Sequence, residues 1–587
     1  MEKTIYPTAT KVDAFTLDIV KDSLIAIGEE MFYALARTSM SPIIYEVLDY
    51  ASGLTDSKGQ LLTQGNGVTG FIGMLSFMVR ETLEKYNKNG DLKPGDIILI
   101  NDPYGGGGSH LCDVGLVMPI FYNGELIAFS ANKAHWTEVG GKDAGSMSTN
   151  STEIYQEGLQ FPCVKLYDQG VLNQSVVEII AANVRFPDLS LGDMWAQVAA
   201  LKTGERRVQE LCEKYDKETV VNSINYLLDH GEQIALKSLK NLPKGTFEAV
   251  DYIDDDGIEK GPFKVQVKVE ITDTEFICDF RGSHPQVTGS INCTLTGLIS
   301  AVRTIYLAVT NPSQDVNDGS FRPLRVITDA GSIFNAVRPA PVSMYWESML
   351  FGTDLVWKAL APLVPDRLSA GHFLSVCVAI LGGKHQDTNE PFLIVEPSVG
   401  GWGGDREKDG ASAQFCILDG ETFNIPVEVC ETRNGVLIDE YSLNTDGMGA
   451  GEFRGGYGVT RAYRSLTDNQ YFTGSFGRHK YNTWGTNEGK EGSTNYFEFV
   501  KSNGETFGPY GKYNQFPLSK NDVTRLVTGS GGGYGNPLDR PIDKVIWDVK
   551  NEYITVEQAE KDYGVTLNPK TLEVVGLSAE RKQKEGE

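Results

Sequence analysis

The chain has 587 residues, of which 41% are hydrophobic and 22% are charged, a composition typical of a globular protein with about two to four domains. Its formal net charge of −25 disfavours a nucleic-acid partner and docking on an anionic membrane surface, because both partners need a basic face. No stretch approaches the ~18 uninterrupted apolar residues of a transmembrane helix, and the first residues lack the apolar core of a secretion signal. We therefore expect a cytoplasmic protein.

The eight cysteines occur singly, at positions 112, 163, 212, 278, 293, 377, 416 and 430. Because the sequence contains no C-x-x-C pair, the spacing indicates neither a structural zinc ribbon nor a disulfide framework. We expect reduced cysteines that pack in the protein core.

Helical spacing of apolar residues predicts four helices in the first part of the chain: 14–37, 74–86, 192–215 and 221–240. Asp13 is a candidate N-cap for the first helix, because its carboxylate can accept hydrogen bonds from the unpaired N–H groups of a first turn. Strand and turn are expected over 50–73, with a hairpin tip at 56–59. Together these elements predict an N-terminal domain over residues 14–243.

Two apolar, strand-like runs flank Asn123-Gly124 within this domain. Asn-Gly between such runs is the strongest short-range hairpin signal, because a type I′ turn requires positive φ at both central residues. If these two residues form the turn, His135 lies opposite Cys112, and Asp113 lies opposite the residue before His135. Pro119 cannot donate a hydrogen bond to the ladder, so it predicts an edge strand or a bulged strand.

His110, Asp113 and His135 are the most informative residues of the chain. Two of its seven histidines fall within 25 positions of each other, with a carboxylate between them. Imidazole and carboxylate are ordinary ligands of catalytic Zn, Mn or Fe, and three protein ligands leave a position open for water or substrate. The hairpin brings both ends of this motif to one edge, which favours a metal site. The alternative is that these polar side chains only satisfy a Gly-rich loop, since H-x-x-D alone is common.

Acidic and amide residues near this trio are candidates for the chemistry around it. Glu138 is expected to act as a general base or to orient a ligand imidazole, the alternative being a solvated loop acid. Glu157 is a second catalytic candidate, although its i,i+4 spacing from Glu153 is equally typical of surface acids on a helical turn. Asn101 and Asp102, at the start of the Gly-rich motif, are expected to contact the substrate.

The rest of the chain predicts two further domains, a middle α/β domain over 244–390 and a Gly-rich, mainly β domain over 391–576. Alternating segments such as V-E-V-C-E-T-R and T-R-A-Y-R-S-L predict strands. The Gly-rich strings lack the pattern of a P-loop, so tight turns are favoured over phosphate cradles. A short helix is expected after Thr555, where T-V-E-Q fits a capping box. Residues 577–587 are expected to form a flexible tail.

These elements indicate an α+β fold of mixed multi-domain architecture, with an N-terminal metal-binding α/β domain and a Gly-rich, β-containing C-terminal part. Several strings, in order along 14–576, also resemble the hydantoinase B/oxoprolinase family; among them are N-D-P-Y-G-G-G-G-S-H-L-C-D-V, H-W-T-E-V-G-G, N-I-P-V-E-V-C-E-T-R and G-S-G-G-G-Y-G-N-P. The resemblance implies one subunit of an ATP-dependent hetero-oligomer, whose hydantoinase A-type companion binds ATP and Mg. This agrees with the missing P-loop.

The resemblance also implies a reaction and a ligand set. Members open cyclic amides such as hydantoins, 5-oxoproline and lactams, while close relatives carboxylate acetone or acetophenone. The metal ligands of related carboxylases correspond to His110, Asp113 and His135, and the resemblance adds Asp49 as a fourth. Segment 65–73 departs from the family because it lacks the histidines that many hydantoinase-like members carry, so the resemblance does not name the substrate.

We therefore predict the metal-binding subunit of an ATP-dependent cyclic-amide hydrolase that holds a divalent Zn, Mn or Fe. Two alternatives stay open. One is a subunit of an ATP-dependent ketone carboxylase, and the other is a non-catalytic scaffold with a structural metal.

Overall fold

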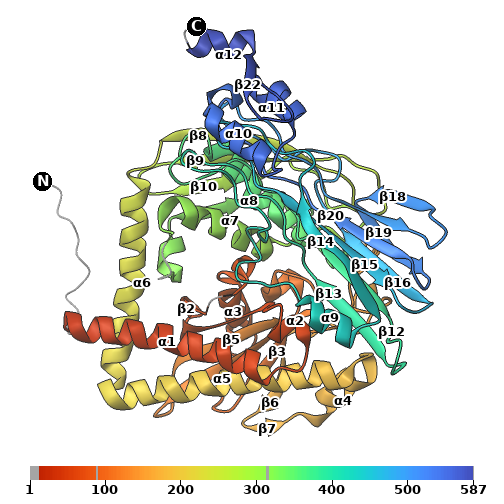
Figure 1. Ribbon diagram of the computed structural model, residues 1–587. Coiled ribbons are helices and arrows are strands. Elements are labelled where there is room, and N and C mark those ends of the chain that lie inside the picture. The colour runs from red at the N-terminus through yellow and green to blue at the C-terminus, as the bar shows by residue number, and fades with distance from the viewer. Residues whose placement is uncertain (1–11, 66, 88–89, 313–315, 586–587) are drawn as a thin grey trace, which may run out of the picture.

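The protein is described by a computed structural model that covers residues 12–585 apart from 66, 88–89 and 313–315. Within these residues the chain builds a seven-stranded sheet, then a four-stranded sheet with helices, then a pair of sheets with four and five strands, and last a two-stranded hairpin (Figure 1). This arrangement confirms the predicted mixed, multi-domain fold. No helix in the described part of the chain has the length and apolar character needed to span a membrane.

The N-terminal sheet has the strand order β2-β1-β5-β4-β3-β6-β7, and every neighbouring pair is antiparallel. Its strands are β1 (Tyr50–Asp56), β2 (Leu61–Gln64), β3 (Ile97–Ile100), β4 (Asp113–Tyr122), β5 (Glu125–His135), β6 (Val164–Asp168) and β7 (Val171–Leu172). Helices α1 (Ala14–Thr38) and α5 (Pro187–Tyr215) cover one face, and α3 (Met74–Tyr86) packs on the other. The sheet is therefore buried on both sides.

The helices of this part agree closely with the predicted ranges. Asp13 caps α1 by accepting hydrogen bonds from the backbone N–H groups of Phe15 and Thr16. Helix α5 begins earlier than predicted, at Pro187, because proline is well tolerated in a first helical turn. Three further helices belong here: α2 (Pro42–Tyr45), α4 (Gln174–Asn183) and α6 (Lys217–Leu239).

The β4–β5 hairpin turns at Asn123 and Gly124, whose φ angles of 50° and 81° confirm the predicted type I′ geometry. Pro119 lies inside an internal strand, between β5 and β3, so the edge-strand interpretation is wrong. The bulge interpretation is confirmed, because the pairing is irregular between Ile120 and Phe121. Strand β3 pairs only with residues 115–117 of β4, which leaves the proline outside that ladder.

The bulge changes the register of the hairpin by one residue. Asp113 pairs directly with His135, whereas the predicted register placed His135 opposite Cys112. That prediction is wrong because it carried the register of the turn along the whole hairpin. Since side chains alternate between the two faces of a strand, the predicted register would have placed Asp113 and His135 on opposite faces.

The middle part follows with strand order β11-β10-β9-β8. Its elements are β8 (Gly245–Ile253), β9 (Phe263–Ile271), β10 (Phe276–Asp279), β11 (Leu324–Ile327), α7 (Leu295–Thr310) and α8 (Trp346–Leu360). Helix α8 packs against α7, β8 and β9, and nearly all of its side chains are buried. Its first turn thereby becomes a fixed wall toward the N-terminal sheet.

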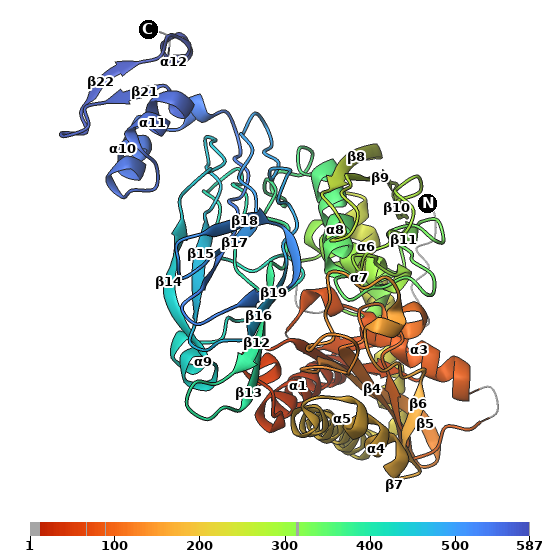
Figure 2. The same ribbon diagram turned by 90° about the vertical axis from the view of Figure 1, so that its right-hand side faces the viewer.

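Two sheets packed face to face form the C-terminal part (Figure 2). One has the order β13-β12-β16-β19, and the other has the order β14-β15-β20-β17-β18. Their strands are β12 (Val378–Lys384), β13 (Pro391–Glu396), β14 (Val436–Asn444), β15 (Gly458–Ser465), β16 (Gln470–Ser475), β17 (Tyr496–Val500), β18 (Thr506–Tyr510), β19 (Lys512–Leu518) and β20 (Val523–Val527). A domain boundary at residue 390 would cut the β12–β13 hairpin, so this part begins before Val378.

Two predictions about the C-terminal part are corrected by the structure. V-E-V-C-E-T-R forms helix α9 (Val427–Arg433), which Pro426 precedes and in which only Cys430 is fully buried. Its alternation therefore does not reflect a sheet with one buried face. The segment expected to be a flexible tail forms helix α12 (Ala579–Glu585), in which buried Arg581 donates hydrogen bonds to the carbonyls of Tyr563 and Arg540.

This last helix lies at the outer end of a small lobe that has its own apolar cluster (Figure 1). The lobe comprises α10 (Ile542–Lys550), α11 (Val556–Tyr563), β21 (Val565–Leu567) and β22 (Val574–Leu577), together with α12. Helix α11 begins with the predicted capping box, formed by Thr555 and Gln558.

The Gly-rich segments pack on one another, backbone against backbone. A Cβ atom added at Gly531 would overlap the Trp402 carbonyl, and one added at Gly401 would overlap the carbonyl of Gly456. The backbone N–H of Gly531 donates to the Gly456 carbonyl at 3.0 Å. None of these three glycines has a positive φ. Lack of space for a side chain, and not turn geometry, therefore explains why these positions are glycine.

Replacing Gly531 by alanine should lower the free energy of unfolding by about 1–3 kcal/mol, the usual cost of overpacking. The matched control is Gly576→Ala, since a Cβ there meets only Thr566, at an ordinary 3.7 Å. Thermal unfolding of the two variants measures the difference. Equal stability would show that the packed loops have room for a side chain.

Candidate metal centre

Three polar residues stand in a row at the ends of three neighbouring strands. Asp113 is the first residue of β4, and it pairs with His135, the last residue of β5. Asp49 immediately precedes β1, and its carbonyl accepts the backbone N–H of His135 at 3.0 Å. Paired residues on adjacent strands project to the same side of a sheet at about 5 Å spacing. The sheet therefore presents Asp49, His135 and Asp113 together.

His110 joins this row from the loop that precedes β4. Its Nδ1 lies 3.1 Å from the Ser343 carbonyl oxygen, and its Nε2 lies 3.2 Å from Oδ1 of Asp113. The ring centroids of His110 and His135 are 4.9 Å apart, and both side chains are buried. Nδ1 of His135 has no hydrogen-bond partner among the described residues. All four residues for which metal ligation was predicted thus meet at one place.

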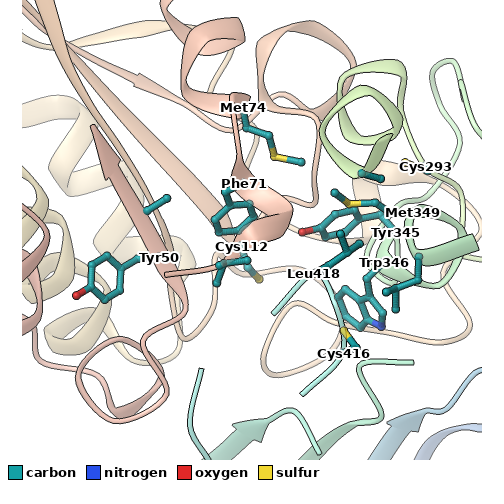
Figure 3. Packing of buried hydrophobic residues seen from close by; sticks show 14 of the residues in the cluster. Tyr50, Phe71, Met74, Cys112, Cys293, Tyr345, Trp346, Met349, Cys416 and Leu418 are labelled. Carbon is teal, nitrogen blue, oxygen red and sulfur yellow. The ribbon is translucent and has the colours of Figure 1, made fainter. Parts of the chain in front are cut away.

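A cavity of about 70 Å³ adjoins these four residues. Its other walls come from the start of α8, from β12 and β13 and from the loop 416–422, and they include Tyr345, Trp346, Met349, Val378, Glu396 and Asp419. Figure 3 shows Phe71 and Cys112 gathered with Tyr345 and Met349 around this junction. The site therefore lies where the three main parts of the chain meet.

Two residues that sequence reasoning missed complete the polar side of the cavity. The Tyr345 hydroxyl donates a hydrogen bond to Oδ2 of Asp113 at 3.2 Å. Asp419 lines the cavity, and its buried Oδ2 lacks a hydrogen-bond partner in the part of the chain that the structure describes. Neither residue belongs to a local motif, and both follow the hairpin by more than two hundred positions in the sequence. No signal in the sequence alone could have connected them with it.

Burial dominates the electrostatics of this site. Together with the neighbouring His110 ring it lowers the pKa of His135 to about 3, so the imidazole is neutral at pH 7. Burial would raise the pKa of Asp113, but His110, Lys133 and His135 outweigh it and hold that pKa well below the usual range. Burial also raises the pKa of Asp419 to about 7.

The pKa of Asp49 is shifted in the opposite direction from that of Asp113. Burial raises the pKa of Asp49 well above its usual value, and the charges of Asp113 and Asp419 raise it further. Three carboxyl groups therefore compete for negative charge in one buried volume, a situation that a bound cation would relieve.

Cys112 adds a fifth ligand candidate, which sequence reasoning had placed in the core. The ligand atoms of His110, Cys112 and His135 all lie within 4.8 Å of one another. The Cys112 thiol donates to the Gly145 carbonyl at 3.3 Å, and burial raises its pKa well above the usual value. A thiol must lose its proton to bind a metal, so this neutral thiol is a weaker ligand than the carboxylates.

The two residues predicted to contact the substrate, Asn101 and Asp102, bond to other parts of the chain. The Asn101 amide donates to the carbonyls of Leu111 and Leu159 and accepts the backbone N–H of Phe161, which uses all its polar atoms. Asp102 accepts the backbone N–H of Tyr104 and pairs with Arg338 at 2.7 Å. Neither lines the cavity, and their bonds hold the Gly-rich loop before His110, so a substrate contact from either residue stays a prediction.

Glu138 is also engaged away from the cavity. Its carboxylate is buried and accepts hydrogen bonds from the backbone N–H and the guanidinium of Arg185, the latter at 2.8 Å. This carboxylate does not line the cavity and holds the connection between α4 and α5 through Arg185, so a role as general base stays a prediction.

Glu157 stands behind the site. Glu153 is exposed and Glu157 is buried, with the 3-10 turn Ile154–Gln156 between them, so the two do not share a solvent face. The Glu157 carboxylate accepts the backbone N–H groups of Val342 and Ser343 at 3.0 to 3.1 Å. The Ser343 carbonyl contacts His110, a candidate metal ligand. Glu157 therefore holds in place a hydrogen-bond partner of that ligand.

The chain is similar to known proteins over nearly its whole length. A family model described as Hydantoinase B/oxoprolinase matches residues 13–537. One subunit of a putative D-/L-hydantoinase from Pseudomonas sp. (strain NS671) is 34% identical over 96% of this chain and 97% of its own. The crystal structure of ATP-dependent caprolactamase from Pseudomonas jessenii has a TM-score of 0.88 and 28% identity, covering 96% of this chain and 98% of that chain.

A nucleotide-free acetone carboxylase structure has a TM-score of 0.90 and covers 97% of this chain and 82% of that chain. Its sequence is 19% identical, and at that level the likeness concerns the fold alone.

The buried Glu157 should make stability depend on pH. Burial raises its pKa from 4.5 to about 8. Between these values the folded chain binds a proton that the unfolded chain has lost, so this group lowers the free energy of unfolding as the pH rises. Glu157→Gln should therefore lose less stability than the wild type between about pH 5 and 8.

Thermal midpoints measured across this range test the prediction, and Glu153→Gln, which removes an exposed carboxylate, serves as the control. Identical pH dependence of Glu157→Gln and the wild type would contradict it.

Proposed function

This chain belongs to the hydantoinase B/oxoprolinase family, and we propose that it is the metal-binding subunit of an ATP-dependent cyclic-amide hydrolase. The observation that carries the proposal is the row of Asp49, His135 and Asp113, completed by His110, beside a buried cavity. Neutral imidazoles and carboxylates are the ligands that catalytic Zn, Mn and Fe sites use.

The geometry around His110 fits a cation. Its Nδ1 faces a carbonyl oxygen and its Nε2 faces a carboxylate oxygen, so both ring nitrogens meet acceptors. An imidazole whose Nδ1–H donates to the Ser343 carbonyl can offer the lone pair of Nε2 to a cation. Nε2 of His110 and Oδ1 of Asp113, which lie 3.2 Å apart, would together be able to hold a divalent ion, whose charge would compensate the buried carboxylate.

The remaining ligand candidates are His135 and Asp49. His135 offers its unpartnered Nδ1, and Asp49 completes the row. When bound here, a divalent ion supplies Lewis acidity, which polarises a carbonyl oxygen and makes water a better nucleophile near neutral pH. The Tyr345 hydroxyl holds Asp113 in place, and the Ser343 carbonyl keeps the His110 ring oriented.

A partner subunit supplies the nucleotide chemistry in this proposal. The sequence contains no P-loop, and the hydantoinase relative is named as a subunit. An unactivated lactam is a poor electrophile because amide resonance stabilises its carbonyl. Phosphoryl transfer from ATP to that carbonyl oxygen in the partner would release ADP and make the ring carbon more electrophilic. Water would then add to this carbon, the ring C–N bond would break as the nitrogen takes up a proton, and a second water would hydrolyse the resulting acyl phosphate to the ring-opened acid and phosphate. The solved caprolactamase relative is likewise ATP-dependent.

Removing either histidine should abolish metal binding. His110→Ala and His135→Ala should each lose the ion, whereas Cys112→Ser should keep it, because the neutral Cys112 thiol is not part of the proposed set. Elemental analysis of the purified chain measures this, with His230→Ala as control, since His230 stacks on Tyr226 away from the cavity. Full retention by both histidine variants would mean that the site is elsewhere.

The chain, its nucleotide-binding partner and ATP should together open at least one of hydantoin, 5-oxoproline and a simple lactam. We expect ring-opened product and ADP to form together, and neither subunit alone to be active. Turnover only with a ketone and bicarbonate would instead make the protein a carboxylase subunit. Absence of both reactions, with the metal retained, would indicate a scaffold.

A further inference from the structure

The cavity beside the candidate metal ligands is too small for the ring of the proposed substrate. Its volume is about 70 Å³, whereas the cavity that holds benzene, a ring of six atoms, measures about 150 Å³. A cyclic amide of similar size therefore enters only if part of the cavity wall moves. The position of this movable part determines the side from which a substrate arrives.

Much of the wall belongs to regular structure. Strands β4, β5, β12 and β13 and helix α8 all contribute to it. The strands are held by the ladders of their sheets, and α8 is buried along most of its length. Two short segments complete the wall, residues 68–71 and 418–422, and neither belongs to a sheet or to a long helix.

A groove of about 850 Å³ lies on the other side of these two segments. Val68 and Thr422 line both the cavity and the groove, so one layer of side chains separates the two spaces. We call these two side chains the partition. At about 30 Å³ per water molecule, the groove has room for on the order of 25 waters. A charged ligand such as a phosphorylated ring can therefore stay hydrated until it reaches the partition.

The backbones on the two sides of the partition are joined to each other. The N–H of Gly70 donates to the Leu418 carbonyl at 2.7 Å. The N–H of Glu421 donates to the Gly67 carbonyl at 3.3 Å, and a Cβ atom added at Gly420 would lie 2.1 Å from that carbonyl oxygen. A change of rotamer moves a side chain without breaking these backbone bonds. The side chains of the partition are therefore the part of this wall that yields most easily.

The partition offers one apolar and one polar side chain to a passing ring. Val68 presents only methyl groups. The Thr422 hydroxyl is buried and has no hydrogen-bond partner in the part of the chain that the structure describes. Because an unpaired buried donor is unfavourable, a carbonyl or phosphate oxygen that passes would relieve it. A cyclic amide carries both an apolar ring and such an oxygen.

The opposite wall of the cavity gives no comparable route. Ile43 and Val395 also line two spaces, the cavity and a pocket of about 50 Å³. That pocket is smaller than the cavity itself, so it cannot hold a ring on its way in.

We propose that the cyclic substrate reaches the metal cavity from the groove, between Val68 and Thr422, and that these two side chains limit the size of the ring substituents that pass. This proposal rests on the proposed function, because it concerns the route to the same cavity.

The test measures how fast a metal-binding probe reaches the site in the full chain loaded with Co(II), whose visible absorption changes when a ligand binds. Acetohydroxamate is the small probe, and benzohydroxamate is the bulky one. Val68→Ala should raise the association rate constant of benzohydroxamate about tenfold, since a methylene-sized group in a tight apolar site is worth that much. It should change the rate constant of acetohydroxamate much less. Val68→Phe, which fills the partition, should slow both probes.

Val395→Ala is the matched control. It makes the same substitution on the opposite wall of the cavity, and Val395 and Val68 are similarly buried, with 7% and 8% of their surface exposed. Both association rate constants should stay unchanged in this variant. An equal gain in Val395→Ala, or no gain in Val68→Ala, would overturn the proposed route.

Two further outcomes are also decisive. If Val68→Ala did not fold, unchanged rate constants in Val68→Phe would overturn the route in its place. A wild-type chain that binds no Co(II) would contradict the metal site of the proposed function, whereas the outcomes that overturn the route leave that metal site intact.

Discussion

A single extra residue in one strand determines whether this site exists. The bulge between Ile120 and Phe121 shifts the hairpin register, and only in the shifted register do Asp113 and His135 project to the same side of the sheet. Asp49 lies beside His135 through the separate and regular pairing of β1 with β5. The placement of Asp113 in this row therefore depends on the bulge, which interrupts the β4–β5 pairing close to Pro119.

The sequence identified the metal-ligand candidates but misjudged much of their surroundings. His110, Asp113 and His135 were recognisable from residue type and spacing, since hairpins bring together residues that lie close in the chain. The polar residues predicted around them bond within the chain. Asn101 and Glu138 hold loops and helices in place, and nothing in the residue type alone distinguishes a buried structural carboxylate or amide from one that faces a substrate.

The longer-range features followed a similar rule. Long helices were predictable because the spacing of apolar residues shows directly which face is buried, as in α1. Short segments were not: Val427–Arg433 alternates as a strand does but forms a helix. Asp419 and Tyr345 could not be linked to the site at all, because their position depends on how the three main parts of the chain dock, which no local sequence pattern encodes.

The cavity lies where the three main parts of the chain meet, and this position has a thermodynamic consequence. A ligand in it touches the N-terminal sheet, the first turn of α8 and the β12–β13 hairpin at once. Its binding free energy therefore also stabilises the docking of these parts against one another. By mass action, a ligand at 100 times its Kd adds about 2.7 kcal/mol to the stability of the folded chain in which the parts are docked. Ligand binding and the docking of the three parts of the chain are therefore thermodynamically coupled, because the contacts that bind the substrate also join these parts.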